Sequence, residues 1–547
     1  MKVESQYTVG KYLIRRLQQV GVNHVFGVPG DYVLSFFSML EKSEIDLVCT
    51  CNELNAGYAA DAYSRVNGIG AVCVTYGVGG FSLLNAVVGA YAERVPMIVI
   101  SGAPRLAERR HHHLLHHTFG DMDLQSRIYE QATVYSAVLS NPASAGRQID
   151  EAITACLRSR RPVYIEIPMD IVNLACPPAR DISIDRTIHS DAGSLAEAVE
   201  EAAAMMDSAK KPAILAGVEV HRLGIRDELR KFITHAGIPF ATSLLGKSVI
   251  SERHPLFTGI YGGAASWESA RRTVLDADIL LSLGVLMTDI ELGGRRSIQD
   301  QSRMILANSD NVRIKHHIYN HVSLQDFINR LGRKISRRKI TPPGISYPYG
   351  KPDRKINLDG SGPITVNGFY TRINRFIGRE NMLTADSGDS LLSAANLFLP
   401  EDVMFINQSF YLSIGYAVPA TLGMCLAMPG KRPIAFVGDG AFQTTAQELS
   451  TIIKLNLNPV IFVSNNQGYL TERLLNEDGL FNDVNVWKYH KLADVFSGGI
   501  GLQVKTNSEL EDALAGIKSN PDSAFIVELV FDKWDCSENL KLLKESL

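Results

Sequence analysis

The sequence predicts an α/β fold of three consecutive doubly wound parallel-sheet domains. Short β-branched runs bounded by glycine or proline, such as GAVCVTYG, PMIVISGAP, PVYIEIP, DILLSLG and PVIFVSNN, alternate with longer helical patterns. Parallel strands need helical crossovers, so this alternation indicates parallel sheets. The chain has 547 residues, well beyond the roughly 250 to 300 at which one hydrophobic core stops growing. Several domains are therefore expected.

Two stretches rich in proline, charge and turn formers, 176–186 and 341–363, are typical of linkers. They divide the chain into the segments 1–180, 190–340 and 362–547. Ligands of open parallel sheets bind beyond the carboxyl ends of the strands. The loops that follow the apolar runs are therefore where chemistry is expected.

Composition excludes several classes of protein. With 46% hydrophobic and 21% charged residues and a net charge of −3, the chain has no basic surplus that would draw it to nucleic acid or an anionic membrane. No apolar run reaches the ~20 residues that span a bilayer. The seven cysteines lack a paired zinc-type spacing and are interpreted as free thiols. The start MKVESQYTVGKYLIRRL resembles an amphipathic helix. We expect a cytoplasmic protein.

The strongest local signal lies in PIAFVGDGAFQTTAQELSTIIKLNLNPVIFVSNNQGY. A strand enters Gly438-Asp439-Gly440, a helix follows, and a second strand ends at Asn466, so a carboxylate and an amide oxygen meet at one sheet edge. Magnesium prefers such oxygen ligands. The glycines allow close approach, and N–H groups at the helix start can hold phosphate oxygens. The pattern predicts a diphosphate with its metal; a plain glycine turn is the alternative.

The first segment carries VPGDY with Asp31, NELNAG with Glu53, and then VTYGVGG. A glutamate that opens a helix is often only a favourable charge at the positive end of the helix dipole. GVGG is not the full dinucleotide-binding fingerprint, which argues against nicotinamide or flavin. The motif LHHTFGD ends a histidine-rich run, which can equally be a solvated loop or a fortuitous metal site; His111 to His113 are assigned no role.

The order of these motifs resembles the thiamine diphosphate enzymes, and LHHTFGD together with GYLTERL resembles their 2-keto acid decarboxylase branch, the pyruvate, indolepyruvate, phenylpyruvate and branched-chain enzymes. The resemblance implies three domains of that enzyme type, with a pyrimidine-binding first, a central second and a diphosphate- and Mg²⁺-binding third. It implies that Glu53 contacts the aminopyrimidine and promotes ylide formation. It assigns Mg²⁺ to Asp439, Asn466 and the carbonyl of Gly468, and the acid/base roles to Asp31, His116, His117 and Glu472.

Further cofactor contacts follow from the same resemblance. FYLSIGYAVPA corresponds to the segment that bends thiamine diphosphate, with Ile414 as the wedge and the backbone of Leu412 facing the aminopyrimidine, where relatives commonly have glycine. Asp389 in TADSGDS is expected near the diphosphate. The full set expected to bind the cofactor is Glu53, Asp389, Leu412, Ile414, Gly438, Asp439, Gly440, Ala441, Asn466 and Gly468.

The substrate pocket is predicted to be large. Ile290, Leu391 and Thr471 stand where pyruvate-specialised bacterial relatives carry two aromatic side chains and an isoleucine, Ser387 is also small, and Leu392 adjoins them. We therefore expect branched, longer linear or aromatic 2-keto acids to be favoured over pyruvate, with overlap because a methylene contact is worth only ~1–3 kcal/mol.

The implied reaction is non-oxidative decarboxylation of a 2-keto acid, through the ylide and an enamine, to an aldehyde and CO₂. Two alternatives stay open, a carboligase of the acetohydroxyacid synthase type and a catalytically silent cofactor-binding protein. The family resemblance also implies a homodimer or homotetramer with active sites at the subunit interface.

Overall fold

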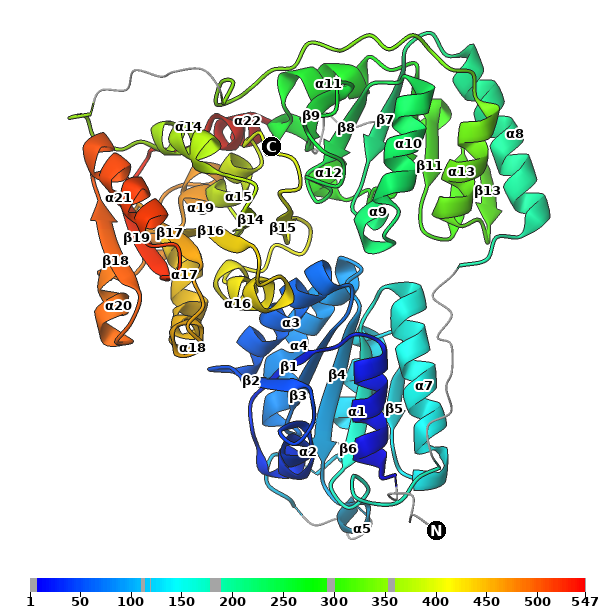
Figure 1. Ribbon diagram of the computed structural model, residues 1–547, viewed down its shortest axis with the longest axis vertical. Helices are drawn as coiled ribbons and strands as arrows, with labels where there is room; N and C mark the ends of the chain where they lie inside the picture. The colour runs from blue at the N-terminus through cyan, green and yellow to red at the C-terminus, as the bar shows by residue number, and fades with distance from the viewer. Residues whose placement is uncertain are drawn as a thin grey trace. The chain divides into compact units, whose positions relative to one another are not determined.

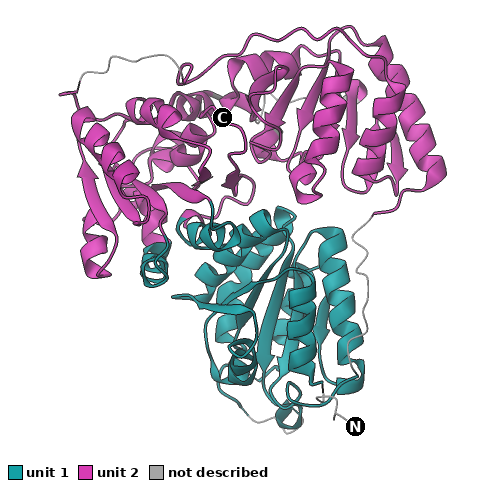
Figure 2. Cartoon of the chain, in the orientation of Figure 1, with its two compact units in different colours: residues 1–187, 418–430, 445–457 teal, residues 188–417, 431–444, 458–547 magenta. Residues whose placement is uncertain are grey.

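A computed structural model describes residues 7–109, 114–118, 120–177, 188–292, 301–352 and 360–546. His111 to His113, residues 178–186 of the first predicted linker and residues 353–359 of the second lie outside the described residues. The chain divides into two compact units (Figure 2). The first comprises Met1–Thr187, Val418–Gly430 and Thr445–Leu457, and the second comprises Ile188–Ala417, Lys431–Thr444 and Asn458–Leu547.

The first unit contains a six-stranded, fully parallel sheet in the order β2-β1-β3-β4-β6-β5 (Figure 1). The strands are β1 (His24–Gly27), β2 (Asp46–Cys49), β3 (Gly70–Val74), β4 (Met97–Ala103), β5 (Ser136–Val138) and β6 (Val163–Pro168). The helices are α1 (Val9–Gln19), α2 (Leu34–Leu40), α3 (Glu53–Asn67), α4 (Val78–Ala92), α5 (Leu106–Arg109), α6 (Leu124–Ala132), α7 (Pro142–Ser159), most of α16 (Ala417–Ala427) and α18 (Leu449–Lys454).

Helices cover both faces of this sheet. Successive strand residues point to opposite sides, so both faces have side chains to bury. Ile165 of β6 packs in the apolar cluster that α1 and α7 share. The next residue back, Tyr164, instead accepts a hydrogen bond from Gln125 of α6, on the other face. Strands β3, β4 and β6 are buried along their whole length, as expected for parallel strands between two helical layers.

The second unit contains two sheets. One has seven strands in the order β13-β12-β11-β10-β7-β8-β9. Its strands are β7 (Pro212–Ala216), β8 (Phe240–Ser243), β9 (Phe257–Tyr261), β10 (Ile279–Leu283), β11 (Met304–Ala307), β12 (Asn311–Ile314) and β13 (His317–Asn320), and its helices are α8 (Ala192–Ser208), α9 (Glu219–Arg222), α10 (Arg226–Ala236), α11 (Glu268–Leu275), α12 (Asp289–Leu292) and α13 (Leu324–Lys334). The pairs β11–β12 and β12–β13 are antiparallel, because their short connections cannot form parallel crossovers.

The other sheet is parallel, in the order β15-β14-β16-β17-β19-β18. Its strands are β14 (Asn381–Ala385), β15 (Phe405–Asn407), β16 (Arg432–Gly438), β17 (Val460–Asn465), β18 (Ile500–Val504) and β19 (Phe525–Val530), and its helices are α14 (Val366–Phe376), α15 (Asp389–Ala394), α17 (Asp439–Thr445), α19 (Leu470–Leu475), α20 (Leu492–Val495), α21 (Asn507–Ser519) and α22 (Glu538–Ser546). Its strand order repeats that of the sheet β1–β6.

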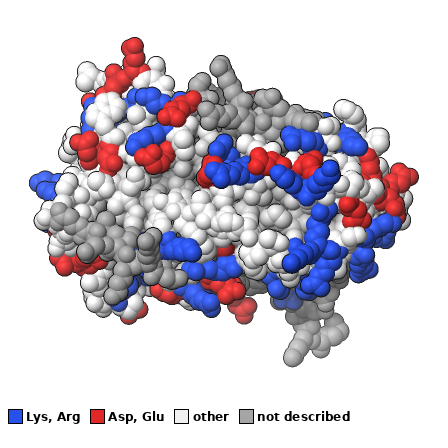
Figure 3. All heavy atoms as spheres, turned by 90° about the horizontal axis from the view of Figure 1, so that it is seen from above, with Lys and Arg blue, Asp and Glu red and all other residues white. Residues whose placement is uncertain are grey.

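The predicted fold class is thus confirmed, with an antiparallel edge on the middle sheet that the prediction omitted. The boundaries 1–180, 190–340 and 362–547 stay a prediction. Among the described residues, no helix combines the length and the apolar character that crossing a membrane requires. On the face shown in Figure 3, basic and acidic side chains lie intermixed. All seven cysteines are free thiols, and Cys49 and Cys51 are the exposed ones.

A buried ion pair ties together segments of the second unit that are far apart in sequence. Lys247 Nζ lies 2.6 Å from Glu252 Oε1 and also donates to the carbonyl of Leu397 at 2.6 Å. Glu252 Oε2 accepts from the N–H of Leu399 at 2.8 Å. Both charged side chains are almost fully buried. The loop after β8 is therefore fixed to the segment that leads into β15.

Replacing Lys247 by methionine should lower the free energy of unfolding by about 3–5 kcal/mol, because it leaves the Glu252 carboxylate buried without a countercharge. The double variant Lys247→Met/Glu252→Gln removes both charges and keeps an acceptor for Leu399, so it should recover part of that loss. Urea denaturation of the variants measures this. A double variant less stable than the single one would contradict the ion-pair account.

Candidate functional site

The two parallel sheets of like order place polar residues at equivalent positions. In the first sheet β1 lies between β2 and β3, and in the other sheet β14 lies between β15 and β16. The loops that follow β1 and β3 therefore run in opposite directions, as do those that follow β14 and β16. Such switch points are where open α/β sheets bind ligands. Asp31 follows β1 and Gly77 follows β3; Asp386 follows β14 and Asp439 follows β16.

The structure brings together Asp31, His116 and His117. His116 Nε2 forms a hydrogen-bonded ion pair with Asp31 Oδ2, and His117 Nδ1 lies 3.9 Å from Asp31 Oδ1. Tyr32 stacks on His116 at 4.9 Å and donates its hydroxyl to the His116 carbonyl at 3.2 Å. Burial acts to raise the pKa of Asp31, but the hydrogen bond and charge of His116 outweigh it and hold that pKa below its ordinary value.

This cluster has the equipment for proton transfer: a carboxylate that stays ionised, an imidazole paired with it, and a second imidazole in reach. The same three side chains place one ligand atom each within 4.8 Å of one another, so a metal could also bind there. The side chains of Asp31 and His116 are 45% and 62% exposed, which leaves them accessible to a substrate.

A buried network that sequence reasoning missed positions His117. A Cβ on Gly77 would lie 2.0 Å from the carbonyl oxygen of His117, and Gly77 has φ 68°, so only glycine fits. The Gly77 N–H donates to Gln125 Oε1 at 2.7 Å, and Gln125 Nε2 donates to Ser101 Oγ at 2.9 Å and Tyr164 Oη at 2.7 Å. Gln125 thus fixes the turn against which His117 packs.

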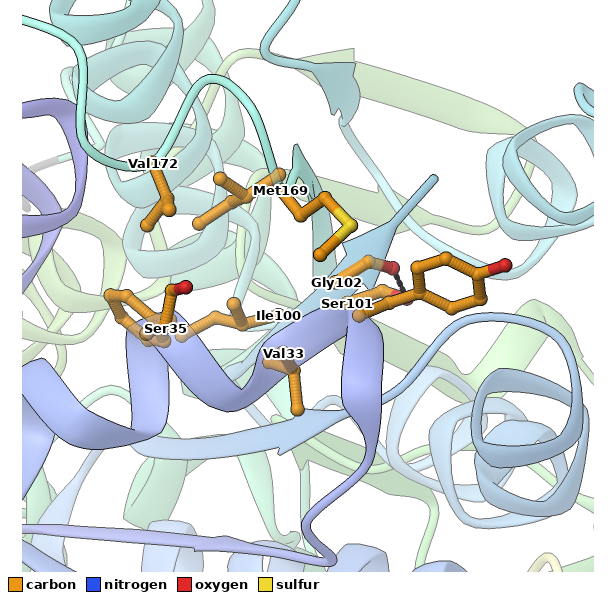
Figure 4. Close-up of a pocket in the computed structure, with 10 residues that line it drawn as sticks. Val33, Ser35, Ile100, Ser101, Gly102, Met169 and Val172 are labelled. Carbon is orange, nitrogen blue, oxygen red and sulfur yellow. Dashed lines mark hydrogen bonds between the residues drawn. The ribbon is translucent and has the colours of Figure 1, made fainter. Parts of the chain in front are cut away.

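The residues behind Asp31 are close-packed. Figure 4 shows the small cavity there, between the start of α2, the end of β4 and the loop after β6. Its volume of about 10 Å³ holds at most one water. A Cβ on Gly102 would lie 2.2 Å from the carbonyl oxygen of Tyr32. This cavity is therefore no substrate site, and it shows that the turn carrying Asp31 rests on β4.

Glu53 opens α3, as predicted, and the helix start is held by two acceptors. Asn52 caps the helix by accepting from the N–H of Asn55 at 2.8 Å. Glu448 Oε2 accepts from Asn55 Nδ2 at 2.8 Å and from the N–H of Cys51 at 3.2 Å. Glu448 is fully buried and burial raises its pKa. This glutamate, 393 residues from Asn55 in sequence, is a positioning residue for Glu53 that the sequence did not reveal.

Gly79 leaves room beside Glu53. A Cβ on Gly79 would lie 3.4 Å from Glu53 Oε1, so the carboxylate faces the first turn of α4. Gly79 of the GVGG motif therefore allows close packing next to Glu53.

In the second unit, Asp439 joins the loops after β16 and β17. Its Oδ1 accepts from the N–H of Gly440 at 2.8 Å and its Oδ2 from the N–H of Gly468 at 3.1 Å. The residue is 1% exposed. Burial raises the pKa of Asp439 to about 6, although the surrounding backbone N–H groups lower it. Within the described residues no basic side chain forms an ion pair with it.

The loop after β17 is locked by a buried arginine that sequence reasoning also missed. Arg473 donates to the carbonyls of Asn466 at 3.3 Å and Gln467 at 2.8 Å and forms an ion pair with Asp483 at 2.6 Å. A Cβ on Gly468 would lie 2.1 Å from the carbonyl oxygen of Asn482. The predicted ligands Asn466 and Gly468 are therefore held in one conformation.

These residues fit a diphosphate with a divalent cation. Asp439, the side-chain amide of Asn466 and the carbonyl of Gly468 are hard oxygen donors of the kind Mg²⁺ takes. A cation would offset the cost of burying the Asp439 carboxylate. A Cβ on Gly438 would meet nothing within 4 Å, so the space before it is open, whereas one on Gly440 would lie 2.4 Å from the ring of Tyr469. Ala441 follows in α17 and is 6% exposed.

Asp386 shapes the predicted cofactor-bending segment. Its carboxylate accepts from the N–H groups of Gly415 at 3.0 Å and Ala417 at 2.8 Å, and it is 1% exposed. Burial raises its pKa to about 6. Leu412 has φ 53° and Ile414 is 40% exposed. A left-handed φ suits glycine, so Leu412 adopts a backbone conformation that is strained for its side chain.

Asp389 contacts the start of the C-terminal helix. Its carboxylate accepts from the N–H of Ser537 at 3.0 Å and from the Ser537 hydroxyl, and burial raises its pKa to about 6. The carboxylate therefore anchors the approach to α22. A contact with a diphosphate stays a prediction.

The predicted pocket residues lie in the second unit and pack in different places. Ile290 packs against the core of the seven-stranded sheet, Leu391 against that of the sheet β14–β19, and Leu392 in a cluster with Leu470 and Leu540. Thr471 faces the turn of Ser387, because its Oγ1 lies 3.1 Å from where a Cβ on Gly388 would be. Glu472 is exposed on α19.

Comparisons with known proteins match all three sheet regions. The thiamine pyrophosphate enzyme family models match here: the N-terminal TPP binding domain at residues 7–126, the central domain at 199–333 and the C-terminal TPP binding domain at 386–528. The chain is 34% identical over 536 residues to an alpha-keto-acid decarboxylase of Mycobacterium avium (strain 104), covering 97% of this chain and 95% of the relative. It is 34% identical over 554 residues to pyruvate decarboxylase 4 of Arabidopsis thaliana, covering 98% and 91%.

Replacing Glu448 by alanine should lower kcat about 10- to 100-fold, because a small displacement of Glu53 is costly, with a smaller effect on KM. Glutamine at this position keeps an acceptor for Cys51 and Asn55 and should restore most of the activity. Steady-state kinetics with saturating cofactor measure both. Glu130→Ala, an exposed glutamate on α6, is the matched control. Equal losses in the alanine and glutamine variants would contradict a positioning role through the acceptor oxygen.

Proposed function

The chain belongs to the thiamine pyrophosphate enzymes and is a thiamine diphosphate-dependent 2-keto acid decarboxylase, and from that premise we propose that it favours branched, longer linear or aromatic 2-keto acids over pyruvate. The observation that carries the proposal is the small bulk of Ile290, Leu391 and Thr471, where pyruvate-specialised relatives of the resembled family have larger side chains. A pocket with less bulk in its walls loses affinity for a methyl group and accommodates longer acyl chains.

The placement of Thr471 supports this proposal. It stands at the start of α19, one residue before Glu472, and its hydroxyl adjoins the Ser387–Gly388 turn. Gly388 has φ 90°, so a side chain there would be strained and the turn presents no bulk. Small groups therefore face each other beside one of the proposed acid/base residues.

The proposed roles of the side chains are the proton transfers that the cofactor does not perform. Bound thiamine diphosphate supplies the carbon nucleophile and the electron sink for decarboxylation. The protein has to deliver one proton to carbon and remove one from a hydroxyl before the aldehyde leaves. The ion pair of Asp31 with His116 holds that imidazole in a fixed orientation, and His117 and Glu472 complete the proposed proton-transfer set.

Cofactor retention is assigned to the second unit. Asp439, Asn466 and Gly468 would hold Mg²⁺ and through it the diphosphate, while Glu53 in the first unit would contact the aminopyrimidine. Leu412 and Ile414 sit on the segment that Asp386 shapes, which supports their proposed role in bending the cofactor. Assembly as a homodimer or homotetramer, with each site at a subunit interface, is part of the same proposal.

The test is a coupled alcohol dehydrogenase assay with thiamine diphosphate and Mg²⁺ on pyruvate, 2-ketoisovalerate, 2-ketoisocaproate, 2-ketohexanoate and phenylpyruvate. We expect kcat/KM to be higher for the larger acids than for pyruvate. Thr471→Ile should shift the ratio toward pyruvate about 10-fold, whereas Thr371→Ile, at a half-buried position of the helix α14, should leave it unchanged.

Dominance of pyruvate in the wild type would contradict the pocket proposal while leaving the reaction class intact. Acyloin rather than aldehyde as the main product would favour the carboligase alternative. Cofactor binding without turnover of any acid would favour the silent binder.

A further inference from the structure

Glu166 of β6 is a buried carboxylate that the proposed reaction does not use. It is 0% exposed, and it lies on the same face of the strand as Tyr164. Arg109 forms a hydrogen-bonded ion pair with Glu166 Oε1, and the Tyr164 hydroxyl donates to Oε2 at 2.7 Å. A buried ion pair is often no more stabilising than apolar side chains of similar size. Stability alone therefore does not account for this carboxylate.

The carboxylate sets the direction of a chain of hydrogen bonds. Burial raises the pKa of Glu166, and the charge of Arg109 opposes that rise and favours the ionised form. An ionised carboxylate can only accept, so the Tyr164 hydroxyl donates to it and the hydroxyl oxygen accepts from Gln125 Nε2 at 2.7 Å. With its nitrogen toward Tyr164, the Gln125 amide presents Oε1 to the N–H of Gly77 at 2.7 Å. Glu166 thus favours the one orientation of Gln125 that pairs with Gly77.

The Gln125 amide has no room to shift. A Cβ on Gly80 would lie 2.3 Å from Gln125 Oε1, and Gln125 is 0% exposed. If the amide turned over, the Gly77 N–H would face an NH₂ group and lose its acceptor, which is costly for a buried donor. The Gly77 turn packs against the carbonyl of His117. A change in the orientation of Gln125 therefore reaches the backbone of His117.

The same carboxylate also holds the chain that leads into the histidine motif. Arg109 is the last residue of α5, and its side chain is 12% exposed. The first residue of that helix, Leu106, donates its N–H to the Asp170 carboxylate in the loop after β6 at 3.1 Å. Both ends of α5 are thus tied to β6 or to the loop that follows it. The end of β6 therefore supports the segment before the histidines through Arg109 and the turn behind His117 through Gln125.

We propose that Glu166 is a positioning residue for the histidine pair. It acts through its two hydrogen-bond partners, on the chain before the pair and on the Gly77 turn, and it exchanges no proton with the substrate. Because His117 adjoins His116, whose imidazole pairs with Asp31, a displaced backbone alters that ion pair as well. The effect of Glu166 on turnover rests on the proposed acid/base role of these residues, whereas its hold on the Gly77 turn does not.

Glu166→Gln tests the direction of the chain, by steady-state kinetics of the holoenzyme and by hydrogen exchange at the Gly77 amide. The new amide turns its oxygen toward Arg109 and its NH₂ group toward Tyr164, so the Tyr164 proton loses its acceptor. We expect kcat to fall about 10-fold with a smaller change in KM, because a small misplacement of acid/base groups is costly. Exchange at Gly77 should become about 10-fold faster. Thiamine diphosphate affinity should stay unchanged.

The reciprocal variant Glu166→Gln/Gln125→Glu completes the chain in the opposite direction. The amide in β6 then donates to the Tyr164 oxygen, Tyr164 donates to the carboxylate in α6, and that carboxylate accepts from the Gly77 N–H. The variant should recover most of kcat and of the protection at Gly77. Both substitutions keep the side-chain volume, so a role in packing alone would not produce this rescue.

Glu151→Gln is the matched control. Tyr135 and Arg147 share the Glu151 carboxylate in the same way, at 2.8 and 2.6 Å, and its side chain is 42% exposed. The control should leave kcat and the exchange at Gly77 unchanged.

Tyr164→Phe breaks the chain but keeps the ion pair, so it should change kcat and Gly77 exchange in the same sense and tests the link if Glu166→Gln does not fold. Unchanged kcat and exchange in Glu166→Gln, or a reciprocal variant as impaired as the single one, would overturn the proposal even if decarboxylation is confirmed. Faster exchange in Glu166→Gln, in a protein whose wild type decarboxylates no 2-keto acid, would contradict the proposed function and still support the hold of Glu166 on Gln125.

Discussion

A buried carboxylate is the constraint on which the candidate site of the second unit depends. Asp439 is 1% exposed, and its two oxygens accept from backbone N–H groups at the ends of two neighbouring strands. Strands β16 and β17 pair in register up to Gly438 and Ser464, so their loops meet at this carboxylate. Backbone donors offset only part of the cost of burying a charge, and burial raises the pKa of Asp439 to about 6. A divalent cation held at this place, as proposed, would offset that cost.

The turns that carry the other candidate residues approach neighbouring atoms so closely that only glycine fits at several positions. Gly77, Gly440 and Gly468 each lie where a Cβ would come within 2.4 Å of a neighbouring atom. Buried side chains from distant segments hold these turns, Gln125 beneath Gly77 and Arg473 beneath Gly468. Rigid support of this kind keeps functional groups within a few tenths of an ångström of their working geometry.

The sequence predicted the fold class and the local arrangement of the motifs because both depend on short-range patterns. Alternating apolar runs and helices predict parallel sheets, and GDG with its following strand places Asp439 and Asn466 at one sheet edge. The structure also joins Asp31 to His116, residues that only the family resemblance had linked. The antiparallel strands β12 and β13 were missed because their four-residue segments NVRI and HIYN are not apolar runs.

Supporting contacts between distant segments were not predictable. Glu448 reaches Asn55 across 393 residues, and Asp386 reaches Ala417 across 31, and no local pattern marks either pair. Asp389 accepts a hydrogen bond from Ser537, 148 residues away, and its expected contact with a diphosphate stays a prediction. Each of these partners is set by tertiary packing, which a single sequence does not specify.

The most direct test of the account is the affinity of thiamine diphosphate as a function of Mg²⁺ concentration in Asp439→Asn and in Glu53→Gln, measured by calorimetry. We predict that Asp439→Asn weakens Mg²⁺-dependent cofactor binding by more than about 100-fold. Glu53→Gln should bind the cofactor almost normally but lose nearly all decarboxylation. Normal Mg²⁺-dependent affinity in Asp439→Asn would contradict the assignment of this carboxylate to the metal.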